Sequence, residues 1–287
     1  YLLLRGINFQ EVKKSFLDVN WFSIILSVIL GILLFFVKVF RWKTILSYKK
    51  NIKFKNLLEV LSISQMVTAV IPFRAGDVVQ IFYLSTKENV DKTTILSSIV
   101  LYQVIDLFSM FLVFIVVSFF IAFPLNKNYI ILPFVIMIMI ITFYLVSREK
   151  ITNFISNYSR YMAEKILLFN EGIKNFFNLQ VFFKVIFMTI LMWILGYLNI
   201  YYFLKGFSIR ITMLGILAFL SLPSMVNVIP LTPGFWGTWD FVAVSVLRMF
   251  GVNKEVALSC VLTMHFVGMC QTVLLGGIFI LKEGVRK

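Results

Sequence analysis

Long apolar runs dominate the chain, and five of them are long enough to cross a bilayer as helices. A hydrocarbon core needs about 20 apolar residues in a spanning α-helix. Lys38 is the one charged residue in the first run, and we expect its ammonium group to reach the headgroups from near the helix end. The pattern predicts spans over Trp21–Phe40, Ile95–Phe123, Tyr129–Val146, Val181–Leu204 and Val256–Leu281. We therefore predict an all-α, polytopic membrane helical bundle.

Two further apolar stretches, 57–84 and 211–250, are interrupted by proline and glycine. Proline removes a backbone donor and clashes with the preceding helical turn, so a helix breaks there. Broken backbone at membrane depth is tolerated only where protein or a water-filled cavity covers it. We therefore expect both stretches to form re-entrant helical hairpins. The residues at the predicted breaks are Pro72, Gly76, Pro233, Gly234 and Gly237, and Pro230 precedes the second group.

The two interrupted stretches recur at a nearly constant offset. The separation of Pro233 from Pro72 along the chain is almost the same as that of Val252 from Val90. Three predicted spans separate the stretches, so the second repeat has the opposite orientation in the membrane. This arrangement predicts one integral membrane domain, 1–287, with repeat 1 at about 1–123 and repeat 2 at about 129–287. Inverted repeats with interrupted helices are typical of transporters, although proline and glycine can also merely kink buried helices.

Composition excludes a soluble protein and gives the basic excess a different meaning. Of the 287 residues 60% are hydrophobic and only 14% are charged, whereas soluble domains have about 25% charged residues. The formal net charge of +14 is read as topology rather than nucleic-acid binding, because basic residues collect on cytoplasmic loops. Residues 41–56, residues 148–180 and the C-terminus are the basic segments, and all fall on one side of the predicted spans. We expect that side to be the cytoplasmic face of the cell membrane.

The basic segment 148–180 mixes charge with apolar residues spaced by three and four. Such spacing indicates an amphipathic helix. The helix either lies on the membrane surface or packs on the bundle as a linker, and we favour the second interpretation.

Charged residues in and around the interrupted stretches are the candidates for function. Arg74 is suited to an anion, because its guanidinium stays charged and matches phosphate or carboxylate geometry. An ion pair with Asp77, three residues away, is an equally good account of Arg74. Asp77 and Asp240 stand where helices restart, so each either caps a helix or lines a polar path.

Two further polar residues lie within predicted spans. Asp106 is too deep in its apolar run for capping, so we expect it to be a proton or cation relay or a charge partner for Arg74. His265 is the one histidine of the chain, and a packing role competes with a place on the polar path. The offset places His265 opposite Gln103 in the other repeat, which favours function.

The sequence offers little for an enzyme. Cys260 and Cys270 do not form a zinc or disulfide motif. A nucleophile–base set and a G-x-x-x-x-G-K phosphate loop are both missing from the chain. We predict a protein that is not an enzyme, with no cofactor or metal and no nucleic-acid partner.

The two motifs resemble a known family, the flippase-like integral membrane proteins related to the transmembrane region of lysylphosphatidylglycerol synthase. Ile71–Asp77 is similar to the proline–arginine–glycine–acid signature of that family, and Pro230–Asp240 is similar to its second, glycine-rich run. Asp106 and the Gly251–Val252 step also fit. The resemblance covers nearly the whole chain and implies lipid translocation, because aminoacyl transfer in multidomain members belongs to an additional soluble domain.

The chain departs from that family at four positions. Gln80, Gln103 and His265 stand where the family tends to have arginine, and Phe235 stands where it has glycine. Fewer arginines weaken the binding of a multiply charged anion, so the resemblance implies a different headgroup here.

Three functions follow as hypotheses. The first is a flippase or scramblase for a phospholipid or a polyprenyl-linked phosphate, whose headgroup moves along a polar path. The alternatives are an ion-coupled carrier of a small anion and a non-transporting partner of a membrane glycosyltransferase. Assembly into a homo-oligomer stays open. The assigned residues are Arg74, Gln80, Gln103 and His265 for the headgroup, and Asp77, Asp106 and Asp240 for the path.

Overall fold

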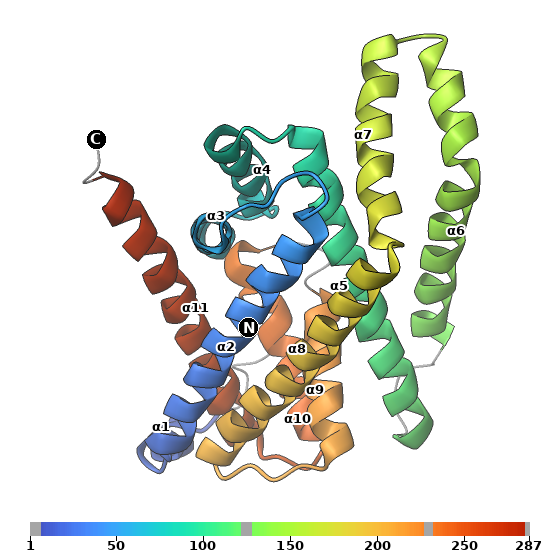
Figure 1. Cartoon of the computed structure of the whole chain (residues 1–287). Coiled ribbons are helices and arrows are strands. Elements are labelled where there is room, and N and C mark those ends of the chain that lie inside the picture. Colours follow the sequence, from blue (N-terminus) through green and yellow to red (C-terminus); the bar gives the residue numbers. More distant parts are fainter. Residues whose placement is uncertain (1–6, 122–127, 227–231, 285–287) are drawn as a thin grey trace.

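A computed structural model describes residues 7–121, 128–226 and 232–284, and all regular secondary structure within these ranges is helical (Figure 1). The predicted all-α class is therefore confirmed. The elements are α1 (Phe9–Leu17), α2 (Trp21–Leu46), α3 (Phe54–Val70), α4 (Ala75–Glu88), α5 (Lys92–Phe120), α6 (Asn128–Ser156), α7 (Arg160–Phe176), α8 (Leu179–Gly206), α9 (Met213–Val226), the 3₁₀ turn η1 (Pro233–Phe235), α10 (Thr238–Met249) and α11 (Lys254–Gly284).

Five of the described helices are long and apolar enough to cross a membrane, as the sequence predicts. They are α2, α5, α6, α8 and α11. The first span is longer than expected, because α2 continues to Leu46 and so contains Arg41. The prediction that the basic loop begins at Arg41 is therefore wrong. The apolar pattern continues through Trp42 and Ile45, which are buried together with Arg41.

Polar residues fix where the long helices begin. The Asn20 side chain accepts a hydrogen bond from the Ser23 amide at the start of α2, at 3.2 Å. Asp91 and Asn178 cap α5 and α8 in the same way. Each cap satisfies a backbone donor that the first helical turn leaves without a partner.

α2 and α8 form the most extensive helix pair and pack along one another. Asn199 Nδ2 donates to the Ser27 carbonyl oxygen at 2.7 Å, and Ser27 Oγ donates to the Asn199 carbonyl oxygen at 2.9 Å. These reciprocal bonds fix the position of the two helices against one another.

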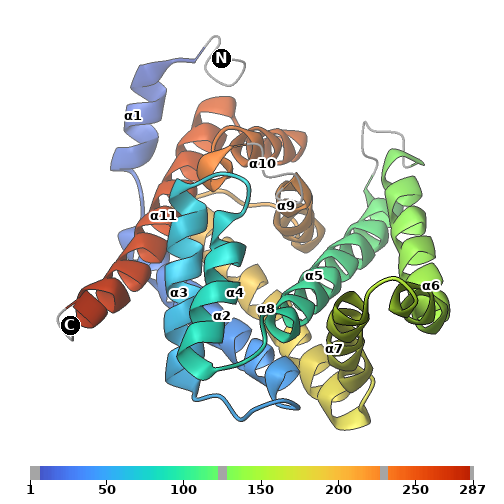
Figure 2. The same cartoon turned by 90° about the horizontal axis from the view of Figure 1, so that it is seen from above.

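The remaining helices make two matching sets of contacts (Figure 2). α3 packs on α4 and α11, whereas α9 packs on α10 and α5. α1 packs on α11, whereas α7 packs on α5. If the residue numbers are shifted by the separation of Pro233 from Pro72, the contact of α3 with α4 corresponds to that of α9 with α10. In the same way, the contacts of α11 with α3 and α1 correspond to those of α5 with α9 and α7.

The interruption at Pro72 divides its stretch into α3 and α4, which pack on one another, and η1 precedes α10 in the second stretch. The backbone at both breaks has two successive residues in the left-handed region. These are Phe73 (φ 60°) and Arg74 (φ 55°), and then Gly234 (φ 56°) and Phe235 (φ 62°). Pro230 lies outside the described residues.

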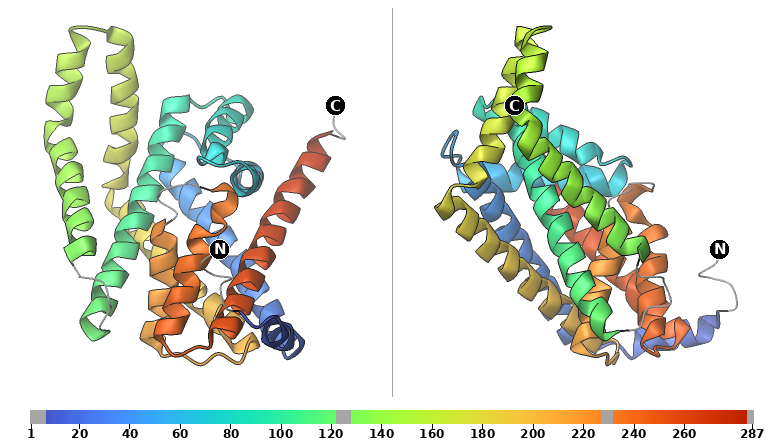
Figure 3. Two further views of the ribbon diagram at one scale, coloured as in Figure 1. Left: turned by 180° about the vertical axis from the view of Figure 1, so that it is seen from behind. Right: turned by 90° about the vertical axis from the view of Figure 1, so that its right-hand side faces the viewer.

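The segment 148–180 is divided among the end of α6, the whole of α7 and the start of α8. α7 packs on α5 and α6, in agreement with the linker interpretation (Figure 3). Two ion pairs hold it, Lys165–Asp91 and Lys49–Glu171, each at 2.7 Å.

The turn between α6 and α7 and the last turns of α11 lie at the upper side in Figure 1, whereas α1 and the α8–α9 connection lie at the lower side. The C-terminal residues 285–287 fall outside the described ranges.

Candidate functional site

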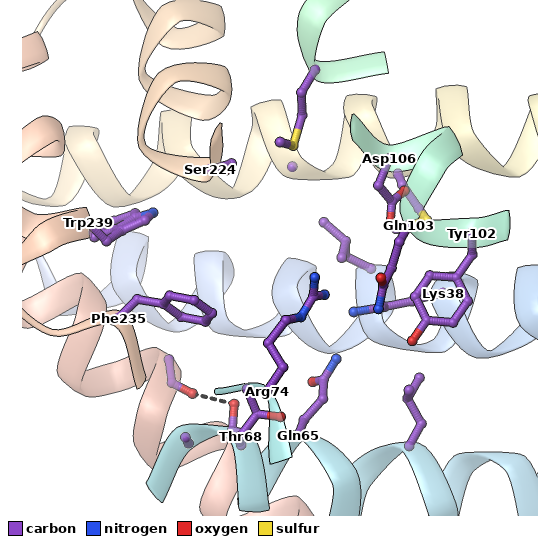
Figure 4. A pocket seen from close by; sticks show the side chains of 18 of the residues that line it. Lys38, Gln65, Thr68, Arg74, Tyr102, Gln103, Asp106, Ser224, Phe235 and Trp239 are labelled. Atoms are coloured by element: carbon purple, nitrogen blue, oxygen red, sulfur yellow. Dashed lines mark hydrogen bonds between the residues drawn. The ribbon is translucent and has the colours of Figure 1, made fainter. Parts of the chain in front are cut away.

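A cavity of about 670 Å³ lies between the two breaks and the helices α2, α5, α8 and α11. Figure 4 shows side chains from several helices converging on it, with the Arg74 guanidinium near the middle. The cavity gathers most of the predicted site residues, namely Arg74, Asp77, Gln80, Gln103, Asp106, Gly234 and His265. The remaining predicted residues shape the walls rather than line them; these are Pro72, Gly76, Pro233, Gly237 and Asp240.

Arg74 enters the cavity from the first break. Its Nε atom lies 3.3 Å from Asp77 Oδ2, so the local ion pair considered from the sequence is present. Gln103 Nε2, on α5, donates to the same oxygen at 2.9 Å. The Arg74 side chain is still 37% exposed, which leaves much of the guanidinium open to the cavity.

Close packing of α3 and α4 sets this position. A Cβ atom on Gly76 would overlap the carbonyl oxygen of Ser64 and the hydroxyl of Thr68 on α3. Only glycine therefore allows α4 to begin so near α3. This contact explains the glycine of the first motif.

Gln80 lies one turn further along α4 and is buried. Its Oε1 atom accepts hydrogen bonds from Tyr102 Oη at 3.2 Å and from Ser64 Oγ at 3.4 Å. Its Nε2 atom is buried and has no acceptor among the described residues. This nitrogen is therefore an unpaired donor that the surrounding side chains close off from the cavity.

Asp106 pairs with Arg41 and not with Arg74. Arg41 Nη1 lies 2.6 Å from Asp106 Oδ1, and Arg41 Nη2 donates to Oδ2 at 2.9 Å. Thr189 Oγ1 on α8 accepts a further bond from Nη1 at 3.1 Å. This two-pronged pair is the geometry that guanidinium and carboxylate prefer. The sequence does not predict this pair, because the run of basic residues 41–56 places Arg41 in a loop.

Lys38 also lines the cavity, so the expectation that it reaches the headgroups from the helix end is wrong. It stands three residues before Arg41, and residues at that spacing share a helix face. Within the part of the chain that the structure describes, Lys38 has neither an ion pair nor a hydrogen bond. The polar lining also includes residues that the sequence does not single out, namely Gln65, Thr68, Tyr102, Ser64, Ser109, Thr189, Ser224 and Thr272.

The second break is built around His265. Its Nδ1 atom lies 2.7 Å from Asp240 Oδ1, and its Nε2 atom lies 2.8 Å from the Gly234 carbonyl oxygen. Trp236 stacks on the ring with 4.0 Å between ring centroids, and Trp239 meets it edge-on at 5.5 Å. The histidine therefore has packing and polar roles at once.

Both nitrogens of His265 face acceptors. The carbonyl oxygen of Gly234 can only accept, so Nε2 carries a proton. The hydrogen bond to Asp240 needs a second proton, either on Nδ1 or on the carboxyl. The pair has no net charge in either case.

Asp240 is 1% exposed and lies behind His265. Its Oδ2 atom accepts a hydrogen bond from the Gly237 amide at 2.8 Å, so the capping interpretation of Asp240 is confirmed. Asp77, in contrast, binds side chains of the cavity. The two carboxylates that the sequence treats alike therefore differ in role.

Within the described ranges, no three His, Cys, Asp or Glu side chains come together as a metal site. Cys260 is buried and Cys270 is partly buried, and both are free thiols.

Comparisons with known proteins agree with the motifs. The family described as "Lysylphosphatidylglycerol synthase TM region" matches residues 1–276. A relative in Methanocaldococcus jannaschii, UPF0104 membrane protein MJ1595, is 25% identical over 313 aligned positions, which cover 99% of this chain and 92% of the relative. No solved structure matches the chain. The chain is thus a multi-pass membrane protein that belongs to the family of the lysylphosphatidylglycerol synthase transmembrane region.

Proposed function

We propose that this protein moves a lipid across the cell membrane as a flippase or scramblase. The headgroup of a phospholipid or a polyprenyl-linked phosphate would pass through the cavity, while the acyl or prenyl chains stay in the surrounding lipid. The observation that carries the proposal is a cavity whose lining has more cationic than acidic side chains and which lies among helices long enough to span a membrane.

The charge of the cavity favours an anion. Three cationic side chains line it, Lys38, Arg41 and Arg74, against two carboxylates, Asp77 and Asp106. Charged groups within a membrane are costly unless they are paired or functional. A volume of about 670 Å³ lies within the range of about 300–1,000 Å³ found for ligand sites.

We further propose that the chain consists of two inverted repeats, each with a re-entrant hairpin. The matching helix contacts and the two pairs of left-handed residues, both at the sequence offset, support this interpretation. In transporters with such repeats the substrate site lies near the midplane, where the interrupted helices meet. The cavity lies between the corresponding breaks here.

The basic excess supports a cytoplasmic location for the α2–α3 connection, the α6–α7 turn and the end of α11. The corresponding orientation places the α8–α9 connection on the outer side.

Reconstitution tests the function directly. Purified protein in liposomes that contain fluorescent phospholipids should speed translocation, and Arg74→Gln should slow it by about tenfold, equivalent to about 1.4 kcal/mol in the barrier. Arg248→Gln is the matched control, since Arg248 is an exposed arginine on α10 and does not line the cavity.

Equal rates for wild type and Arg74→Gln would contradict the role of Arg74, and a rate no higher than in empty liposomes would contradict translocation. Uptake of a small soluble anion without lipid movement would favour the carrier instead. Loss of a lipid-linked product in cells, without translocation by the purified protein, would favour the glycosyltransferase partner.

A further inference from the structure

The second break is bound by an imidazole that faces an acceptor on each side. His265 Nε2 lies 2.8 Å from the Gly234 carbonyl oxygen, and His265 Nδ1 lies 2.7 Å from Asp240 Oδ1. A carbonyl oxygen only accepts hydrogen bonds, and so does an ionised carboxylate. Both contacts are therefore hydrogen bonds only while the imidazole and the carboxyl together hold two protons.

Loss of one proton from this pair breaks one of the two contacts. If the remaining proton is on Nε2, the lone pair of Nδ1 faces the Asp240 carboxylate. If the remaining proton is on Nδ1, the lone pair of Nε2 faces the Gly234 carbonyl oxygen. Either arrangement brings two acceptors together without a donor, which is unfavourable for groups shielded from water.

The backbone of the second break is strained and depends on such contacts. Phe235 has a φ of 62° between Gly234 and Gly237, which also have positive φ, and a bulky residue rarely adopts this conformation. Strained residues persist only where the surrounding structure fixes them. Asp240 also accepts the Gly237 amide through Oδ2, at 2.8 Å, so the pair binds the break at both ends. A Cβ atom on Gly234 would lie 2.8 Å from the Ala69 carbonyl oxygen, so the break packs against the end of α3.

The first break is bound by donors of another kind. Its Gly76 carbonyl oxygen accepts a hydrogen bond from the Ser64 hydroxyl at 2.8 Å, and the Gln103 amide donates to Asp77. A hydroxyl and a carboxamide keep their protons over the range in which an imidazole gains or loses one. The two breaks should therefore respond differently to pH.

Protons can reach the pair from the cavity, because His265 lines it and its side chain is 13% exposed. Trp236 stacks flat on the ring, and the face of an indole attracts a cation, so the protonated ring is favoured. Asp240 on α10 is the ionisable side chain that contacts His265 within the described ranges, and α1 meets α11 near Glu255, at the start of the helix. The other ionisable side chains of the described lining lie on α2, α4 and α5, namely Lys38, Arg41, Arg74, Asp77 and Asp106.

We propose that His265 and Asp240 form a proton-binding site that controls the second break. The break is bound to α11 while the pair holds two protons, and it is released when the pair gives one proton to water in the cavity. The neutral pair then becomes a single negative charge. The bound state is favoured at low pH and is lost as the pH rises, because it is the state with more protons. The inference concerns the conformation of the break and holds whether or not the protein moves a lipid.

Hydrogen exchange of the full chain in nanodiscs, followed by mass spectrometry, tests the inference. Residues 232–241 report the second break, and residues 72–80 report the first break in the same sample. After correction for the intrinsic effect of pH on exchange, protection of 232–241 should be about tenfold lower at about pH 9 than at about pH 6, the effect of losing about one hydrogen bond. Protection of 72–80 should stay the same.

Asp240→Asn should reverse the response. The new carboxamide oxygen would accept the Gly237 amide, and its nitrogen would donate to Nδ1 of a neutral imidazole whose Nε2 proton binds Gly234. All contacts are then satisfied at high pH, and protonation of the ring breaks one of them. Glu255→Gln is the matched control, because it changes another carboxylate of α11 and should respond as wild type does.

Each result decides the claim. Equal corrected protection of 232–241 at both pH values in wild type, which needs no variant, would overturn the inference. A loss at high pH in Asp240→Asn as large as in wild type would also overturn it, as would a response that disappears in Glu255→Gln. A reversed response in Asp240→Asn would support it, because a merely structural role of Asp240 would not change the sign of the pH dependence.

Discussion

The two breaks have the same backbone and opposite chemistry. Each has two successive left-handed residues, at Phe73 and Arg74 and at Gly234 and Phe235. Each is followed by a carboxylate that binds a side chain of the next long helix, Asp77 to Gln103 and Asp240 to His265. The first break nevertheless places a guanidinium in the cavity, and the second places aromatic rings there.

The two breaks therefore share a backbone geometry, whereas the residues at each break decide what that geometry is used for. Arg74 and Phe235 occupy matching positions, since each stands two residues after the proline of its break, and they face one another across the cavity. We interpret the first break as the part that binds the anion and the second as the part that closes the cavity with neutral, well-packed groups.

Removing one partner of the Arg41–Asp106 pair should have the largest effect on stability. Arg41→Met would leave Asp106 without its partner, and loss of one member of a buried pair is destabilising by about 3–5 kcal/mol. Asp106 is 34% exposed to the cavity, so the lower end of that range is expected. Thermal unfolding in detergent measures the loss, and Arg41→Met/Asp106→Leu should recover part of it. A double variant less stable than the single would contradict this account of the pair.

Alanine in place of the glycines at the two breaks should lower the free energy of unfolding by unequal amounts. Gly76→Ala would force α3 and α4 apart, and overpacking of this kind is destabilising by about 1–3 kcal/mol or more. Gly237 has open space around its Cβ position, so Gly237→Ala meets only the strain of its positive φ, of order 1 kcal/mol. Unfolding midpoints of both variants test the difference. Equal losses would show that the α3–α4 contact is less tight than the structure has it.

Removal of the side chains that bind Asp240 and Asp77 should also destabilise the protein by different amounts. His265→Leu would leave buried Asp240 without its side-chain partner, at a loss of about 1–3 kcal/mol. Gln103→Leu should lose only about 0.5–1.5 kcal/mol, because Asp77 keeps Arg74. Tryptophan emission reports the first change, since Trp236 and Trp239 contact His265. An emission change in Gln103→Leu as large as in His265→Leu would contradict the separation of the two clusters.

Acid should produce the smallest effect, a weaker docking of α7 on α5. The hydrogen bond from Lys165 lowers the pKa of Asp91 below its ordinary value. This pair therefore stabilises the docking of α7 above pH about 4, and the contribution is lost as the pH falls through the pKa of Asp91. α1 packs on α11, where the Asn8 amide donates to Glu255 Oε1 at 3.5 Å.

A nitroxide spin label at exposed Leu167 would measure the mobility of α7. We expect the spin label to be more mobile at pH 3 than at pH 7. The shift in the docking equilibrium of α7 should be below about 1 kcal/mol, as for other exposed ion pairs. Asp91→Asn should reduce the pH dependence, and Asp91→Asn/Glu171→Gln should remove it, because the Lys49–Glu171 pair also holds α7. A pH response in Asp91→Asn as large as in wild type would contradict the role of Asp91.

Much of this fold could be predicted from the sequence, because span length and helix breaks depend on local rules. Twenty apolar residues predict a crossing helix wherever they occur, and proline ends a helix without help from its neighbours. The Pro72–Asp77 motif therefore identified both the break and a wall of the cavity.

The pairing of charges could not be predicted, because it depends on which helices meet. Asp106 was assigned to Arg74 or to a relay, yet its partner is Arg41 from α2. A signal was present, since Lys38 and Arg41 share a helix face and the apolar pattern continues past Arg41 to Leu46. Because Arg41 begins a run of basic residues, the charge pattern assigns it to a loop and hides this signal.

Photo-crosslinking at Phe235 tests the central claim, that an anionic lipid headgroup enters the cavity between the breaks. A benzophenone amino acid would replace Phe235, which lines the cavity, or Phe187, which is exposed on the outside of α8. In nanodiscs with equal phosphatidylglycerol and phosphatidylethanolamine, we predict that position 235 captures mainly phosphatidylglycerol and that position 187 captures both. Capture of no lipid at position 235, or of both lipids in their bulk proportion, would contradict the account.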